Sequence, residues 1–140
     1  MEINSIANGI VIDHIRAGSG MKVLEYLHVD LRQGMVAFIM NAPSLKLGRK
    51  DIIKIENYTD FDLKVLGLIE HNATVNVIED HVIVKKIKLN LPERVTNVLR
   101  CKNPRCVTSA EAVPHIFHRV EQSEMYRCEY CDDIVRADEY

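Results

Sequence analysis

Residues 101–106 read Cys-Lys-Asn-Pro-Arg-Cys, and residues 128–131 read Cys-Glu-Tyr-Cys. The four cysteines are separated by four, 21 and two residues, and the 140-residue chain has no others. Each close pair suits a tight turn that presents two sulfur atoms to one tetrahedral ion. The spacing therefore predicts one structural zinc ion, held by Cys101, Cys106, Cys128 and Cys131.

The segment around the cysteines has only a small set of large apolar residues. They are Val107, Val113, Ile116, Phe117, Val120 and Tyr126. About forty residues with so small a core are marginally stable unless a cross-link or a metal holds them. Zinc binding and folding are one event in such modules. We therefore expect residues 97–140 to form a small zinc-bound β domain.

Other uses of the cysteines are two disulfides, four separate thiols or a catalytic zinc. The N-terminus lacks a basic stretch followed by an apolar signal core, so we expect a cytoplasmic protein, in which metal is favoured over disulfides. A catalytic zinc keeps one position open, whereas four thiolates saturate the ion. His115 and His118 lie between the pairs, and we interpret them as core or surface residues that are not ligands.

Residues 1–90 alternate between β-rich runs and two short amphipathic segments. We expect strands at 9–15, 35–40, 50–56, 73–78 and 82–87. One helix is expected through Met21, Leu24, Leu27 and His28, and another from a cap at Thr59 to about residue 71. This order predicts an α+β fold, a two-layer ferredoxin-like sandwich with both helices on one face of an antiparallel sheet.

Several short segments mark the ends of these elements. Gly18-Ser19-Gly20 fits a turn with a helix cap, or a phosphate cradle at a helix start. Asn41–Ser44 is expected to be a loop that ends the second strand, and Glu79–His81 a hairpin turn. Leu91–Arg94 interrupts the pattern and marks the boundary between the two domains.

Polar residues occur at several places on the expected strands. They are Asp13, His14, Lys54, Asn76 and Lys86. Lysine and histidine can bind phosphates, and an aspartate can accept hydrogen bonds from ribose hydroxyls. From pattern alone, solvated side chains on an open sheet face are the favoured interpretation.

Composition and motifs exclude several classes of function. Residues 1–99 carry 12 basic and 12 acidic side chains and residues 100–140 carry six and eight, a balance that argues against a zinc-ribbon nucleic-acid binder. No apolar run reaches the length of a membrane span. We find no nucleophile elbow, Walker loop or dinucleotide fingerprint, and we expect no enzyme activity from the chain alone.

The sequence resembles one known family, the regulatory chains of aspartate carbamoyltransferase. The resemblance rests on the cysteine spacing and on motifs spread over nearly the whole chain. These motifs are GIVIDHI at 9–15, NAPS at 41–44, GRKDIIKIEN at 48–57, ATVN at 73–76 and LPER at 91–94. Arg16 departs from the family pattern, in which a proline is common at this position, and His81 replaces an aromatic residue.

The resemblance implies a non-catalytic subunit that binds nucleoside triphosphates (CTP, UTP, ATP) through residues 1–90. By position, Ile6 and the region of His81 would contact the base, and Asp13 and Lys54 the ribose. The phosphates would face His14, Asn76 and Lys86. The resemblance also implies docking on catalytic chains through the zinc domain, at 102–105 and the turn after Cys131, and pairing of regulatory chains through their allosteric domains.

Overall fold

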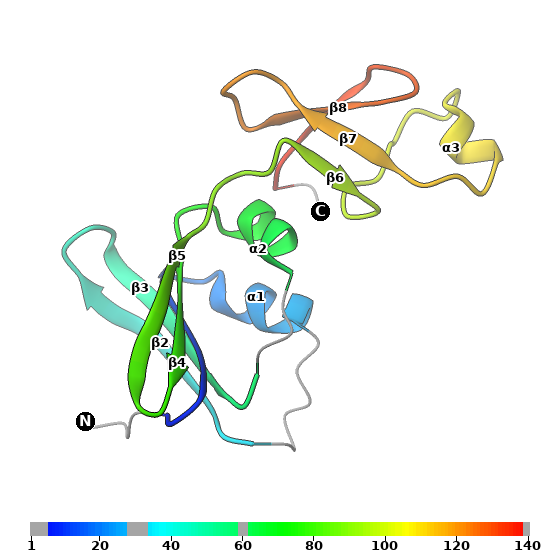
Figure 1. Cartoon of the computed structure of the whole chain (residues 1–140). Helices are drawn as coiled ribbons and strands as arrows, with labels where there is room; N and C mark the ends of the chain where they lie inside the picture. The colour runs from blue at the N-terminus through cyan, green and yellow to red at the C-terminus, as the bar shows by residue number, and fades with distance from the viewer. Residues whose placement is uncertain (1–5, 28–33, 59–61, 139–140) are drawn as a thin grey trace. The chain divides into compact units, whose positions relative to one another are not determined.

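The computed structural model describes residues 6–27, 34–58 and 62–138 of the chain. The chain divides into two compact units, Met1–Asn90 and Leu91–Tyr140 (Figure 1). His28, Thr59 and Phe61, which the sequence assigns to helices, lie outside the described residues. No helix in the described part is long and apolar enough to cross a membrane.

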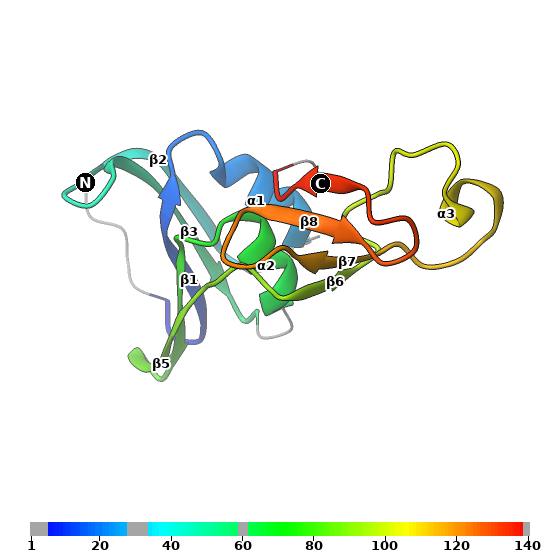
Figure 2. The same ribbon diagram turned by 90° about the horizontal axis from the view of Figure 1, so that it is seen from above.

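The first unit is built on a five-stranded antiparallel sheet in the order β2-β3-β1-β4-β5. The strands are β1 (Gly9–Arg16), β2 (Val36–Ser44), β3 (Gly48–Glu56), β4 (Thr74–Glu79) and β5 (Val82–Lys88). Helices α1 (Gly20–Leu27) and α2 (Leu63–Ile69) cover the same face of this sheet (Figures 1 and 2). The predicted α+β class, with an antiparallel sheet and two helices, is confirmed.

Buried and less buried side chains alternate along the central strands, so one face of the sheet is covered and the other is open. Ile10 and Ile12 of β1 have no exposed surface, and between them Val11 is only half-buried. Because successive side chains of a strand point to opposite faces, the buried isoleucines face the helices. The other core residues of this layer are Ile15, Val23, Leu27, Ile53, Ile55, Leu66, Leu68, Ile69 and Val75.

Helix α1 buries a face that is rotated from the predicted one and shares Leu27 with it. Its buried residues are Gly20, Val23 and Leu27, while Met21 is 50% exposed. A Cβ atom on Gly20 would lie 2.4 Å from a ring carbon of Phe38. Because Gly20 has no side chain, the helix can start against this ring. Val23 and Leu27, three and seven residues later, lie on the same face of the helix and are therefore buried with it.

Helix α2 is shorter than predicted, because its cap is Asp62. The Asp62 carboxylate accepts hydrogen bonds from the backbone N–H groups of Lys64 (2.9 Å) and Val65 (3.3 Å). It thereby satisfies donors that the first turn leaves unpaired. The helix ends at Ile69, and Glu70 follows it with φ of −145°.

The expected loop at Asn41–Ser44 is wrong, because β2 continues through Ser44. The pairing of β2 with β3 shifts register between Ile39 and Ala42, and Asn41 has a φ of 59°. This is a β-bulge. Strand β2 lies at the edge of the sheet, where a proline such as Pro43 is tolerated because it has no ladder N–H to lose.

The expected hairpin at residues 79–81 is confirmed. Asp80 and His81 connect β4 and β5, and both have positive φ, 49° and 66°. Two successive left-handed residues form the turn that matches the twist of paired antiparallel strands.

The second unit is a four-stranded antiparallel sheet with one turn of helix. Its elements are β6 (Arg94–Thr96), α3 (Val107–Ala110), β7 (Ile116–Arg119), β8 (Met125–Cys128) and β9 (Ile134–Arg136). Residues 94–96 pair with 116–118, so this unit includes residues before position 97. Ile116, Phe117 and Tyr126 are buried as expected, whereas the predicted valines at 107, 113 and 120 are half-buried. The core is completed by Leu91, Val95, Leu99 and Val135.

Candidate functional site

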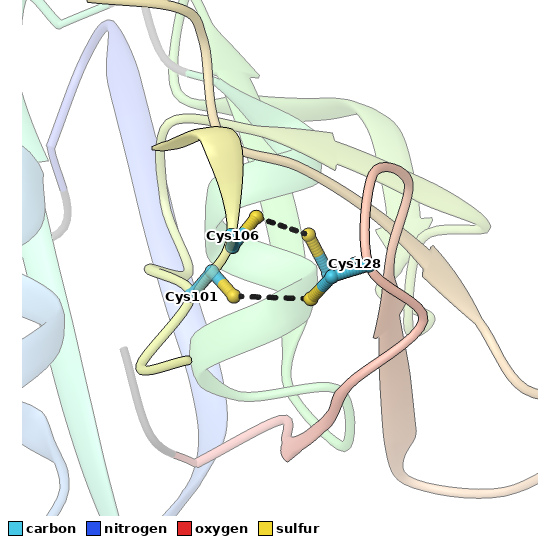
Figure 3. Close-up of side chains that lie close together, drawn as sticks. Cys101, Cys106 and Cys128 are labelled. Atoms are coloured by element: carbon cyan, nitrogen blue, oxygen red, sulfur yellow. Dashed lines mark hydrogen bonds between the residues drawn. The ribbon is translucent and has the colours of Figure 1, made fainter. Parts of the chain in front are cut away.

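The four cysteines converge at one end of the second unit. Their sulfur atoms all lie within 4.8 Å of one another, with 3.5 Å between Cys101 and Cys131 and 3.8 Å between Cys106 and Cys128 (Figure 3). An ion with metal–sulfur bonds of about 2.3 Å would separate its tetrahedral sulfurs by about 3.8 Å. The cysteines form no disulfide. The donor set therefore fits a thiolate-bound metal ion, and the predicted cluster of four cysteines is confirmed.

The surroundings of the sulfur atoms differ. Burial raises the pKa of the Cys101 thiol to about 12 and also raises the pKa of Cys128. The hydroxyl and backbone N–H of Thr108 stabilise the Cys106 thiolate and lower its pKa to about 7. Burial thus resists proton loss from Cys101 and Cys128, and a bound cation would reverse this preference. The cluster is therefore suited to binding a cation.

Neither histidine between the cysteine pairs is part of the cluster. Nδ1 of His115 accepts a hydrogen bond from the backbone N–H of Cys101 at 3.1 Å. Nε2 of His118 lies 3.0 Å from Oε1 of Glu129, and both side chains are substantially exposed. Both histidines are close to the cysteine turns, but sulfur atoms alone make up the donor set.

In the first unit, three of the predicted nucleotide residues lie in one row across the open sheet face. Lys54 pairs with Val11, Val11 with Asn76, and Asn76 with Lys86. Directly paired residues of antiparallel strands project from the same face. Lys54 and Asn76 are half-buried, Lys86 is exposed, and Oδ1 of Asn76 is buried without a hydrogen-bond partner in the described residues.

Asp13 and His14 lie at the bulge that interrupts the pairing of β1 with β3 between Ile12 and Ile15. Nζ of Lys50 lies 3.0 Å from Oδ1 of Asp13, an ion pair that was not predicted from the sequence. The sequence could have indicated that Lys50 belongs to this group, because it lies four residues before Lys54 on the same strand, and such residues project from the same face. His14 has a φ of 61°, and its buried Nδ1 has no partner within the described segments.

Ile6 and His81 come together at the turn between β4 and β5. The backbone N–H of His81 donates to the carbonyl of Ala7 at 2.9 Å, next to the buried Ile6. Ile83 pairs with Ile78 and is 59% exposed. A register shift on β5 gives Ile83 the position that Val84 would occupy in a regular strand. The alternation of residues in the sequence therefore could not predict that Ile83 lies on this face.

The Gly18-Ser19-Gly20 segment does not form a phosphate cradle. The N–H groups of Gly18 and Gly20 both donate to Oδ2 of Asp51, each at 3.1 Å. Asp51 has no exposed surface and also accepts the N–H of Asn41 at 3.1 Å through Oδ1. An internal carboxylate already occupies the place that a phosphate would take.

Two family models match this chain. The model for the aspartate carbamoyltransferase regulatory chain, allosteric domain, matches residues 1–90, and the model for the metal binding domain of the same chain matches residues 93–140. The chain belongs to the aspartate carbamoyltransferase regulatory chain family. The predicted family is thus confirmed.

Curated regulatory chains are similar over almost the whole length. That of Clostridium botulinum (strain Hall) is 55% identical over 136 residues, which are 96% of this chain and 93% of the relative. That of Clostridium acetobutylicum is 54% identical over 139 residues, 98% of this chain and 95% of the relative. That of Bifidobacterium longum is 51% identical over 135 residues, 95% and 97% of the two chains. As a regulatory chain, the protein is a non-catalytic subunit with an allosteric domain and a metal-binding domain.

Proposed function

We propose that this regulatory chain binds nucleoside triphosphates on the open sheet face and transmits their effect to catalytic chains of aspartate carbamoyltransferase. CTP, UTP and ATP are the proposed effectors, and pyrimidine biosynthesis is the controlled process. The observation that carries the proposal is the row of Lys54, Asn76 and Lys86 on the face opposite the helices.

The chemistry of this face suits a nucleotide. Lys86 and the unpartnered polar atoms of His14 and Asn76 supply groups for phosphate oxygens and neighbouring hydroxyls. Asp13 and Lys54 are the proposed ribose contacts. Ile6 and the region of His81 would contact the base, and the exposed apolar side chain of Ile83 supports that end of the site. The triphosphate would then lie toward His14, Asn76 and Lys86.

The proposed metal is one structural zinc ion per chain, bound by the four cysteines. Zinc is the ion most often held by four thiolates in tetrahedral structural sites, where it stabilises the fold. The loop 102–105 and the turn after Cys131 are the proposed contact with the catalytic chain. Tyr130 and Ile134 flank that turn and are 41% and 48% exposed, as expected of side chains that a partner covers.

The domain assignment and the assembly are part of the same proposal. Residues 1–90 would be the allosteric domain, a ferredoxin-like sandwich, since β1 to β4 have the order β2-β3-β1-β4 with a helix after β1 and another after β3. Residues 97–140, with the strand at 94–96, would form the zinc domain. Regulatory chains would pair through their allosteric domains, in the cytoplasm.

Pyrimidine triphosphates and ATP would compete for this site and favour different quaternary states. An effector shifts such an equilibrium only through its different affinities for the two states. The direct test is to co-express the chain with an aspartate carbamoyltransferase catalytic chain and record aspartate saturation with CTP, UTP or ATP. We expect the half-saturating aspartate concentration to depend on the nucleotide. Identical curves with all three and with none would contradict the proposal.

Replacing Lys86 by alanine should weaken nucleotide binding. Loss of a charge-assisted contact is worth roughly 1.5 to 3 kcal/mol, or about 10- to 150-fold in Kd. Calorimetric titration of the full chain measures this change. Lys85→Ala is the matched control, because Lys85 is adjacent on β5 and pairs with Val77, on the opposite face from Asn76. Equal affinity in the Lys86 variant and the wild type would remove Lys86 from the site.

A further inference from the structure

His115 is joined to the segment that leads into the first cysteine turn. The N–H of Asn97 donates to the carbonyl of His115 at 2.7 Å, and the N–H of His115 donates to Oδ1 of Asn97 at 2.9 Å. The neighbouring pair, Thr96 with Ile116, is the last pair of the β6–β7 ladder. These reciprocal bonds extend that ladder by one step, and they fix the His115 backbone beside the chain that enters Cys101.

The ring of His115 then makes the next contact. Its Nδ1 accepts the Cys101 N–H at 3.1 Å, so Nδ1 carries the lone pair and the ring proton lies on Nε2. Cys101 is half-buried and lies four residues beyond Asn97. The imidazole therefore connects the end of the ladder to the backbone of the first cysteine itself.

The second cysteine turn is held by the same end of β7. The N–H of Glu129, inside the second pair, donates to the carbonyl of Ile116 at 2.9 Å. Phe117 pairs with Cys128 in the β7–β8 ladder. Residues 115–117 thus contact both cysteine turns, the second through main-chain bonds and the first through the His115 side chain.

We propose that His115 is a positioning residue for the metal centre, which fixes the Cys101 turn through its side-chain acceptor without being a ligand. The inference rests on the proposed metal site. A backbone N–H bonded to an acceptor holds the turn in the geometry in which the Cys101 sulfur faces the other three. Removing the acceptor leaves the turn free to move, and the sulfur cluster is less well formed before the ion binds.

The test is the zinc affinity of the full-length chain, measured by competition with a chelator of known affinity. His115→Leu should raise the zinc Kd by roughly 10- to 100-fold, the usual effect of losing an outer partner of a metal ligand. His115→Asn, whose Oδ1 can take the place of Nδ1, should recover most of the affinity. His118→Leu is the matched control, because His118 lies three residues further along the chain, on β7, and it should stay close to wild type, since its partner Glu129 is exposed.

Cobalt substitution separates positioning from ligation. The cobalt form of His115→Leu should keep the thiolate charge-transfer bands of four sulfur ligands, and loss of that spectrum would overturn the assignment. Unchanged zinc affinity in His115→Leu, or equal weakening in the asparagine variant, would also overturn it. If the leucine variant does not fold in excess zinc, His115→Ala gives the same comparison. Failure of the wild-type chain to bind zinc would instead contradict the proposed metal site itself.

Discussion

Asp51 shows how one side chain organises an end of the first sheet. Its carboxylate is fully buried and accepts three backbone N–H groups, from Gly18, Gly20 and Asn41. These donors belong to the turn before α1, to the first residue of α1 and to the bulge of β2, where regular backbone pairing is interrupted. Buried backbone donors need partners, and Asp51 supplies them. This accounts for an aspartate in the middle of a strand.

Replacing Asp51 by alanine should destabilise the chain by about 3 kcal/mol or more. The buried N–H of Gly20 left without an acceptor costs about 1 to 3 kcal/mol, and the part-buried N–H groups of Gly18 and Asn41 lose the same acceptor. Urea unfolding followed by circular dichroism measures the change. Asp51→Asn retains one side-chain oxygen and should recover only part of the loss. A loss below about 1 kcal/mol in the alanine variant would mean that these donors find other partners.

Asp13 should contribute to the pH dependence of stability. Burial alone would raise the pKa of its carboxyl. The hydrogen bonds from Lys50 and the His14 N–H, together with the charges of both residues, outweigh burial, so the net pKa lies below the ordinary 3.8. The folded chain therefore favours the carboxylate. Its stabilising contribution is fully present well above pH 3.8 and is lost as the pH falls through the lower folded pKa.

Urea midpoints of the wild type and of Asp13→Asn, measured between roughly pH 6 and pH 2.5, test this expectation. The wild type should lose more stability on acidification than the variant, because only the wild type has this carboxylate to protonate. Other acid-sensitive groups, the thiolates included, are shared by the two chains and cancel in the comparison. Parallel curves would show that the Asp13 ion pair adds nothing to stability.

At the scale of elements, α2 has a close approach that only glycine permits. A Cβ atom on Gly67 would lie 2.2 Å from the carbonyl oxygen of Asn90. Alanine has the higher helix propensity by about 1 kcal/mol, but relieving a backbone clash of this size costs typically 1 to 3 kcal/mol. Gly67→Ala should therefore lower stability, as measured by thermal unfolding. A raised Tm would mean that the two segments separate easily.

A second link between elements joins the end of β1 to the end of α2. Arg16 is the last residue of β1 and places its Nε 3.2 Å from Oε2 of Glu70. Glu70 follows α2 and is 1% exposed. The arginine thus supplies the opposite charge that a buried carboxylate requires.

Sequence patterns predict the elements better than their local irregularities. The alternation of Ile53 and Ile55 with Lys54 and the two-residue turn at Asp80 and His81 follow from short-range rules, and the structure has both. The bulges at Asn41 and Val84 depend on pairing with a neighbouring strand, which single-sequence periodicity does not contain. The role of Asp51 was likewise hidden, since its partners lie 10 or more residues away.

At the scale of the whole molecule, the chain combines two units with different means of stabilisation. The first has a continuous apolar layer between its sheet and two helices. The second has a small core and a cluster of four cysteines. The spacing of these cysteines in the sequence was enough to predict the cluster. A metal ion would bring its two cysteine turns together, and the contact with a catalytic chain would then depend on that ion.

The most direct measurement is native mass spectrometry of the chain co-expressed with its catalytic partner, before and after treatment with a zinc chelator. We expect one zinc ion per regulatory chain in the intact complex. We also expect that removing the zinc releases catalytic subunits that still turn over their substrates. A metal-free regulatory chain that keeps its catalytic partner with unchanged affinity would contradict the account.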